Sequence, residues 1–220
     1  MSGIRLSMRV WDLPIRLFHW AVVALLAIAY VSELEFWMQV HFVSGYALLS
    51  LLLFRLVWGF VGSDTARFRK FLVSPVQGLL HLARFPRREE DRQIGHNAAG
   101  GWMVLLLLAL LAAETISGLF GRDDEVSEGP LAHRLTEHGS ALSLAVHALC
   151  WNLILAAVAL HLLAILAYRV VKGHDLLRPM ITGKKRLPAA TRPPRMASPL
   201  LALLVLACAA VLVGIVVNAF

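Results

Sequence analysis

The chain has 220 residues, 59% of them hydrophobic and 16% charged, with a formal net charge of +7 and a mean hydropathy of +0.70. Soluble globular domains usually contain about 25% charged residues, so this composition argues against one. The positive charge lies in short segments between apolar stretches, which is typical of membrane proteins rather than of a nucleic-acid-binding face. The two cysteines, Cys150 and Cys208, both fall inside apolar stretches and predict no disulfide framework.

Five apolar stretches are long enough to cross a bilayer, which takes about 20 helical residues. We expect them at residues 15–32, 40–61, 99–119, 143–168 and 198–218. Strands would need alternating polar and apolar residues with repeated turn signals, and neither is visible. The sequence therefore predicts an all-α integral membrane protein. A four-helix bundle is expected within residues 1–186, and a Pro-rich linker with a fifth, C-terminal transmembrane helix within residues 187–220.

The distribution of basic residues predicts the orientation in the membrane, because cytoplasmic loops are enriched in Lys and Arg. Except for Arg122 and Arg134, every Lys and Arg lies before or at the start of the first stretch, near the end of the second, in the loop at 62–95, or after the fourth. All these segments fall on one side of the membrane. The sequence therefore predicts a multi-pass protein with a cytoplasmic N-terminus.

The loop at 62–95 contains a helix signal of its own. Ser74 and Pro75 precede an apolar stripe made of Val76, Leu79, Leu80, Leu82 and Ala83. Serine at a cap and proline in the first turn are typical of a helix start. We expect a short amphipathic helix on the cytoplasmic membrane surface, with His81 on or beside it.

Four of the nine histidines lie within the predicted membrane helices. His19 and His161 are near the cytoplasmic ends of the first and fourth helices, whereas His41 and His147 are near the outer ends of the second and fourth. A histidine inside a membrane helix is costly unless it is paired or bound, so each of the four is a candidate functional residue. Three further histidines are expected to be solvated in loops: His133, His138 and His174.

The spacing of two of these histidines points to a pair of stacked sites. His147 and His161 are 14 residues apart, so they differ by about 40° in azimuth and by ~21 Å along the helix axis. Two ligands on one face, one in each leaflet, suit two stacked haem groups. Depth pairs His41 with His147 in an outer site and His19 with His161 in an inner one. Two imidazoles saturate a haem iron, which then only transfers electrons.

Two other interpretations of these histidines stay open. A single membrane histidine often only forms a hydrogen bond between helices. A zinc site would need four ligands around one point, whereas these residues lie at two depths. No Cys-x-x-Cys-His motif is present, so any haem would be held by axial ligands and packing alone.

Five segments carry a family resemblance: Val10-Trp11-Asp12-Leu13-Pro14-Ile15-Arg16-Leu17-Phe18-His19-Trp20, His41-x-x-x-Gly45-Tyr46, Phe54-Arg55-Leu56-Val57-Trp58-Gly59-Phe60-Val61-Gly62, Gly95-His96-Asn97 and Met180-Ile181-Thr182-Gly183-Lys184. Together they cover residues 10 to about 186. They resemble prokaryotic cytochrome b561, in the branch that includes the b-type subunits of nickel–iron hydrogenases.

This resemblance implies two haem b groups, with ligands on helices one, two and four, which is the placement already reached from depth. It also implies a quinone substrate, and the candidate contacts are His96 and Asn97 at the cytoplasmic start of the third helix. Free backbone N–H groups at a helix start would add donors there, although a plain helix-capping role fits Asn97 equally well. Three basic residues are candidate contacts for the propionates of the inner haem: Arg55, Arg169 and Lys184.

The sequence departs from the family pattern in two places. The fifth helix is an addition to the four-helix core. Glu114 stands where relatives often have glutamine. We expect its carboxyl either to be hydrogen-bonded to Thr115 or Ser117 near the membrane interface, or to accept a proton beside the outer haem.

The expected function is electron transfer across a bacterial inner membrane, between a quinone pool and a periplasmic partner such as a small cytochrome c or a larger redox subunit. The outer loop at 121–139 is rich in acidic residues, which predicts a partner with a basic docking face. Membrane lipid is a further expected partner, and nucleic acid is not. Two alternatives stay open: a non-redox membrane anchor or zinc-handling transporter, and a stand-alone oxidoreductase that acts on a small molecule such as superoxide.

Overall fold

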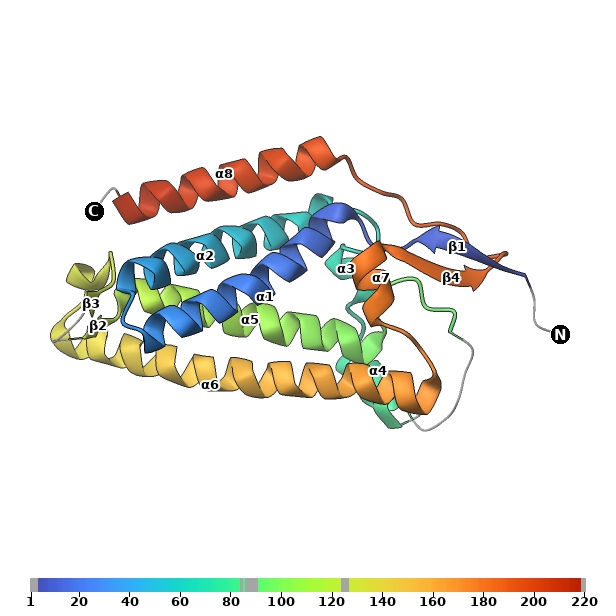
Figure 1. Cartoon of the computed structure of the whole chain (residues 1–220), viewed down its shortest axis with the longest axis horizontal. Helices are drawn as coiled ribbons and strands as arrows, with labels where there is room; N and C mark the ends of the chain where they lie inside the picture. The colour runs from blue at the N-terminus through green and yellow to red at the C-terminus, as the bar shows by residue number, and fades with distance from the viewer. Residues whose placement is uncertain (1–3, 84, 86–90, 124–126, 219–220) are drawn as a thin grey trace. The chain divides into compact units, whose positions relative to one another are not determined.

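The computed structural model describes residues 4–83, 85, 91–123 and 127–218. Within these residues, five helices are long and apolar enough to cross a membrane: α1 (Leu13–Leu34), α2 (Met38–Val61), α5 (Ala98–Phe120), α6 (Glu137–Ala167) and α8 (Pro199–Asn218). Figure 1 shows them as the long ribbons of the molecule. The all-α membrane fold is therefore confirmed, and the expected spans agree with these helices except at the start of α6.

Polar side chains cap two of the helices where the sequence changes from loop to apolar stretch. Oδ1 of Asp12 accepts the N–H of Ile15 at 2.7 Å at the start of α1. Oδ1 of Asn97 accepts the N–H of Gly100 at 2.7 Å at the start of α5. Each bond satisfies a backbone donor that the first helical turn leaves without a partner, and each contributes about 1 kcal/mol to helix stability.

Helix α6 begins at Glu137, six residues before the start expected at 143. Hydropathy misses this first turn because its side chains are polar. The hydroxyl of Thr136 nevertheless accepts the N–H of Gly139 at 3.2 Å, and an acidic residue in the first turn suits the helix dipole. The expectation that His138 lies in a loop is therefore wrong, since it lies exposed in this first turn. At its other end α6 continues into a π-helical turn, Tyr168–Lys172.

The chain divides into two compact units, and the long helices contribute segments to both. The first unit contains Met1–Leu17, Leu56–Leu106 and Ala157–Ala202, and the second contains Phe18–Arg55, Leu107–Ala156 and Leu203–Phe220.

The first unit contains a two-stranded antiparallel sheet, in which β1 (Arg5–Arg9) pairs with β4 (Lys184–Pro188). Three short helices belong to it as well: α3 (Phe68–Phe71), α4 (Pro75–Ala83) and α7 (Leu177–Thr182). The short helix predicted from Pro75 is confirmed as α4 (Figure 1). The sheet was not expected, because strands of five mostly polar and basic residues carry no hydropathy signal.

A buried polar network joins the segments of the first unit. The indole N–H of Trp58, which is fully buried, donates to Oδ2 of Asp12 at 3.1 Å. The hydroxyl of Thr65 donates to the carbonyl of Val10 at 2.7 Å. These bonds hold the start of α1 against the segment that follows α2.

The Pro-rich linker before α8 is bound to the same unit. The N–H of Ala197 donates to the hydroxyl oxygen of Ser63 at 2.9 Å. The backbone N–H of Asp64 donates to the carbonyl oxygen of Arg195 at 3.0 Å. The backbone N–H of Arg195 donates to Oδ2 of Asp64, also at 3.0 Å. The linker therefore follows a defined path over residues 195–197.

The second unit carries a short hairpin, in which β2 (Arg122–Asp123) pairs with β3 (Ser127–Glu128), and a 3₁₀ turn at Ala132–Arg134. Arg122 and Glu128 form an ion pair at 2.5 Å across the hairpin. Two acidic residues of the expected docking loop, Asp124 and Glu125, lie outside the described residues. The part of α8 in this unit buries two side chains, Ala209 and Val213.

Candidate functional site

Two of the four predicted ligand histidines face each other in the second unit. His41 lies in the first turn of α2, and His147 lies on α6. Their ring centroids are 6.1 Å apart, and the ring planes are inclined by 74°. Two imidazoles on opposite sides of one metal ion, each with a metal–nitrogen bond of ~2 Å, place their centroids about 6 Å apart. The spacing therefore suits two axial ligands of one iron.

Each of the two rings is oriented by a backbone carbonyl. Nδ1 of His41 lies 3.0 Å from the carbonyl oxygen of Ala29, and Nδ1 of His147 lies 2.9 Å from that of Glu114. A carbonyl oxygen only accepts, so each Nδ1 carries the proton and each Nε2 of the neutral ring has its lone pair available for a metal. Metal-binding histidines usually donate their second N–H in this way. An edge-to-face ring contact would give a similar spacing but would not require this pattern of hydrogen bonds.

Two glycines shape the surroundings of the histidine pair. A Cβ on Gly118 would lie 3.0 Å from Cε1 and 3.2 Å from Nδ1 of His147, so α5 approaches the imidazole closely because residue 118 has no side chain. A Cβ on Gly45, one turn after His41 on α2, would meet no atom within 4 Å. A flat macrocycle requires open space of this kind, so the residues around the pair are compatible with haem.

Glu114 presents a buried carboxyl group to the same site. The residue is 8% exposed, and its Oε1 lies 3.4 Å from Nε2 of His147. Its Oε2 is buried and has no hydrogen-bond partner within the described part of the chain. Hydroxyl bonding by its neighbours, one of the two expectations, is not observed. Thr115 donates to the carbonyl of Leu111 at 2.8 Å, and Ser117 donates to the backbone carbonyl of Glu114 at 3.0 Å. A buried polar atom left without a partner fits a site that a bound group completes.

The other two predicted ligands belong to different units. His19 lies on α1 in the second unit, and His161 lies on α6 in the first. Both side chains are half-buried. Their pairing therefore stays a prediction. Of the candidate propionate contacts, Arg55 is buried at 3% exposure in the second unit, whereas Arg169 and Lys184 are exposed in the first.

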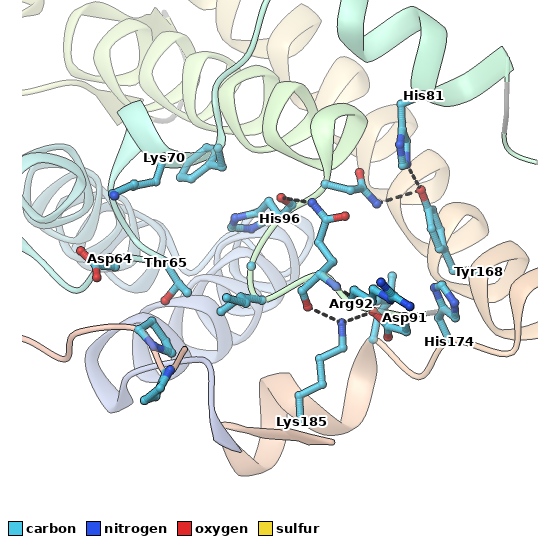
Figure 2. A pocket seen from close by; sticks show the side chains of 18 of the residues that line it. Asp64, Thr65, Lys70, His81, Asp91, Arg92, His96, Tyr168, His174 and Lys185 are labelled. Atoms are coloured by element: carbon cyan, nitrogen blue, oxygen red, sulfur yellow. Dashed lines mark hydrogen bonds and ion pairs between the residues drawn. The ribbon is translucent and has the colours of Figure 1, made fainter. Parts of the chain in front are cut away.

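A pocket of about 980 Å³ lies within the first unit, and His96 and Asn97 both line it. Figure 2 shows His96 in this pocket. The imidazole of His96 packs against two aromatic rings at tilted angles, with its centroid 4.7 Å from that of Trp11 and 4.8 Å from that of Phe71. The structure thus brings both predicted quinone contacts into one cavity, with the His96 ring held by aromatic contacts.

Asn97 is both a helix cap and part of a side-chain network. While its Oδ1 caps α5, its Nδ2 donates to the hydroxyl oxygen of Tyr168 at 2.8 Å. The same hydroxyl lies 2.7 Å from Nε2 of His81, which projects from α4 (Figure 2). The capping role considered from the sequence is therefore observed, together with a second bond that faces the pocket.

The pocket lining carries more positive than negative charge. Its cations are Lys70, Arg92, Lys172, Lys185 and Arg192, and its acids are Asp64 and Asp91. Lys185 and Asp91 neutralise each other at 2.7 Å, and the same ammonium donates to the carbonyl of Gln93 at 2.8 Å.

Sequence reasoning missed Tyr168 as a site residue, although a signal for it exists. Tyr168 follows His161 by seven residues, so it returns to the same face of α6 within about 20° and lies ~10 Å further along the axis. The carbonyl partners of His41 and His147 and the hydroxyl contact of His81 carry no such signal, because they depend on how helices pack.

The described residues contain no group of three or more His, Cys, Asp or Glu side chains arranged to hold a metal ion. A model of the family described as prokaryotic cytochrome b561 matches residues 10–183 of the chain. No curated protein and no solved structure matches the chain.

Proposed function

Because the chain belongs to the prokaryotic cytochrome b561 family, we propose that it carries electrons across a bacterial inner membrane through two haem b groups, between a quinone pool and a periplasmic redox partner. The family assignment itself implies a multi-pass membrane protein that transfers electrons through haem b. The number of haem groups, the quinone substrate and the periplasmic partner are what we propose beyond the family assignment.

The observation that carries the proposal is the histidine pair of the second unit. His41 and His147 lie at the spacing of two axial ligands, and carbonyl bonds at both Nδ1 atoms leave both Nε2 atoms available. When bound, haem b supplies a one-electron carrier at this position. The imidazoles of His41 and His147 would hold the iron, and with both as ligands no position would remain for oxygen or substrate, which favours electron transfer over catalysis at the iron.

We assign the second haem to His19 and His161. The 14-residue interval between His147 and His161 supports this assignment, because it places a second ligand on the same face of α6. Arg55 is buried at 3% exposure, and a buried guanidinium needs an anionic or hydrogen-bonding environment. A haem propionate is a suitable anion, so we assign Arg55 to the same haem.

We place the quinone in the pocket of the first unit. His96 and Asn97 line this pocket, and so does Tyr168, which follows the proposed ligand His161 by two helical turns. A substrate in the pocket would therefore lie within about 10 Å, along the helix axis, of a proposed haem ligand. The positive lining also suits the oxygen atoms of a quinone headgroup, which gain negative charge on reduction.

We propose a cytoplasmic N-terminus, because the basic segments at 62–95 and after residue 168 follow the enrichment of Lys and Arg in cytoplasmic loops, and we propose that the acidic loop at 121–139 is periplasmic. We propose that residues 1–186 form the haem-binding domain, and that residues 187–220 append a linker and a membrane helix to it.

Single substitutions of the four histidines test the assignment. His41→Ala and His147→Ala should each remove one and the same haem, and His19→Ala and His161→Ala should each remove the other. His138→Ala provides a matched control, because His138 lies exposed on α6. Reduced-minus-oxidised spectra and pyridine haemochrome content of the purified variants measure the loss. A shared spectrum for His19→Ala and His147→Ala would overturn the pairing, and a colourless wild-type protein would overturn the function.

A further inference from the structure

Three side chains from different segments form a continuous hydrogen-bonded chain along the pocket of the first unit. Asn97 caps the start of α5, Tyr168 opens the π-helical turn that follows α6, and His81 lies on α4. The bond from Nδ2 of Asn97 to the Tyr168 hydroxyl measures 2.8 Å. The bond between that hydroxyl and Nε2 of His81 measures 2.7 Å (Figure 2). All three residues line the pocket.

The helix cap fixes the direction of the first bond. Oδ1 of Asn97 accepts the N–H of Gly100 at 2.7 Å, so Nδ2 is the group that faces Tyr168, and the Tyr168 oxygen accepts from it. The hydroxyl proton is then available to Nε2 of His81 at 2.7 Å. In the neutral tautomer with its proton on Nδ1, the His81 ring accepts this bond at Nε2.

The neighbouring groups hold this geometry in place. The α4 backbone at Gly78 is buried against α5, where a Cβ would lie 3.1 Å from Cδ1 of Trp102. Tyr168 is 8% exposed, and the ring of Phe85 packs against it with centroids 5.0 Å apart. Nζ of Lys172 lies 5.9 Å from the Tyr168 ring centroid, which adds a positive charge over the ring.

From this arrangement we propose that Tyr168 and His81 transfer a proton between the quinone headgroup and solvent, and that Asn97 orients the Tyr168 hydroxyl. The proposal rests on the proposed function, because it takes the quinone to occupy this pocket. A structural role alone would require only that Tyr168 anchor α4. The chain also places a phenol and an imidazole in direct hydrogen-bond contact beside a cavity, which is what proton transfer requires.

In quinol oxidation the relay takes up protons from the substrate. One quinol yields one quinone, two electrons and two protons, and the electrons leave to haem b, the carrier that the family supplies. The two protons leave in two passages. In each passage an O–H bond of the quinol breaks and its proton bonds to the Tyr168 oxygen, while the Tyr168 proton passes to Nε2 of His81. The His81 imidazolium then loses one proton to water, and proton exchange with water returns the neutral ring to its Nδ1–H tautomer before the next passage. Quinone reduction runs the same transfer in reverse.

Stopped-flow kinetics of the haem-loaded protein test the relay, with ubiquinol-1 as the substrate and haem reduction as the signal. Tyr168→Phe keeps the ring but removes the proton, and His81→Gln keeps an acceptor but cannot carry a charge. Both should slow the maximal rate of haem reduction by about 10²-fold or more, as loss of an acid–base group does, with little change in the half-saturating ubiquinol-1 concentration. The matched controls are Tyr30→Phe, an exposed tyrosine of α1, and His138→Gln, and both should react at the wild-type rate.

Nitrogen-15 NMR of histidine-labelled protein provides a readout that does not depend on activity. The wild type should show His81 with its proton on Nδ1, and Tyr168→Phe should shift that tautomer balance because the donor to Nε2 is gone.

Three outcomes distinguish failure of the proton relay from failure of the proposed quinone site. Rapid haem reduction by ubiquinol-1 in the wild type, together with an unchanged rate in Tyr168→Phe or His81→Gln, overturns the relay and leaves the quinone site standing. A His81 ring protonated on Nε2 in the wild type also overturns the relay. If dithionite reduces the wild-type protein but ubiquinol-1 does not, the quinone assignment is overturned and the relay with it. If Tyr168→Phe fails to retain haem, His81→Gln carries the test alone, because His81 lies on the short helix α4.

Discussion

The close approach of α5 to His147 allows a test with a single added carbon. In Gly118→Ala the new Cβ would lie 3.0 Å from Cε1 and 3.2 Å from Nδ1 of the imidazole. Carbon atoms pack best at roughly 3.5–4.0 Å, so the ring must move by about half an ångström. The movement acts on the bond from Nδ1 to the carbonyl of Glu114, which is 2.9 Å long.

The expected energy has two parts with opposite signs. Overpacking of this kind costs about 1–3 kcal/mol. The added carbon displaces the imidazole of His147, the proposed ligand, and not the backbone of α5. Alanine meanwhile improves helix propensity by about 1 kcal/mol over glycine, so the protein without haem is not expected to lose stability. At 1.4 kcal/mol for each factor of ten, the affinity for the haem held by His147 should fall roughly tenfold to a hundredfold.

The assay compares Gly118→Ala with Gly214→Ala in membranes depleted of haem and titrated with haemin. A Cβ on Gly214, in α8, meets no atom within 4 Å, so this variant gains the same helix propensity without the clash. Weak retention or a shifted potential of one haem in Gly118→Ala, with both haems normal in Gly214→Ala, is the expected result. Equal affinities and potentials in the two variants would refute the placement of haem against His147.

Three further predictions concern the whole chain. A pyridine haemochrome assay should give two haem b groups per chain, extractable by acid acetone because no thioether bond holds them, and one group per chain would contradict the pairing. Truncation after Arg186 should keep both haems, because α8 contains neither histidine nor methionine; haem loss at normal expression would show that α8 supports the site. Replacing Asp123, Asp124 and Glu125 with lysine should slow electron exchange with a basic partner at low salt more than at high salt, and an unchanged low-salt rate would exclude the loop from docking.

The membrane helices could be predicted from the sequence because their signal, a long apolar stretch, is local. The start of α6 could not, since its first turn at Glu137 is polar and is held by a cap on Thr136 rather than by hydrophobicity. The pairing of β1 with β4 could not be predicted from the sequence either. Its strands are brought together from opposite ends of the chain, and their register, Arg9 beside Lys184, has no counterpart in local pattern.

The candidate ligands were accessible to sequence reasoning because histidines are rare and costly in membrane helices, and because the helical repeat relates His147 to His161. The groups that orient them were not. The carbonyl of Ala29 and the missing side chain of Gly118 act through the position of the backbone. The identity of a residue does not predict that position. Tyr168 lies between these cases, since its interval from His161 was readable but its bond to α4 required the fold.

Helix α6 carries the proposed ligands His147 and His161, and the pocket residue Tyr168 directly follows it, at intervals of 14 and 7 residues that are close to whole numbers of turns. This regularity makes the helical phase itself testable. Inserting one alanine between Ala156 and Ala157 rotates His161 and Tyr168 by about 100° relative to His147 and shifts them by only ~1.5 Å. A change of phase without a change of depth separates the two requirements of the site.

The insertion should leave the haem of His41 and His147 in place, because both of those residues precede it and belong to the second unit. It should remove the haem assigned to His161 and abolish reduction by ubiquinol-1, since ligand and pocket tyrosine turn away together. One alanine inserted after Val216, near the end of α8, provides the control, because no proposed ligand follows it. Retention of both haems with a normal spectrum in the α6 insertion would mean that the face shared by His147 and His161 is not what positions the inner haem.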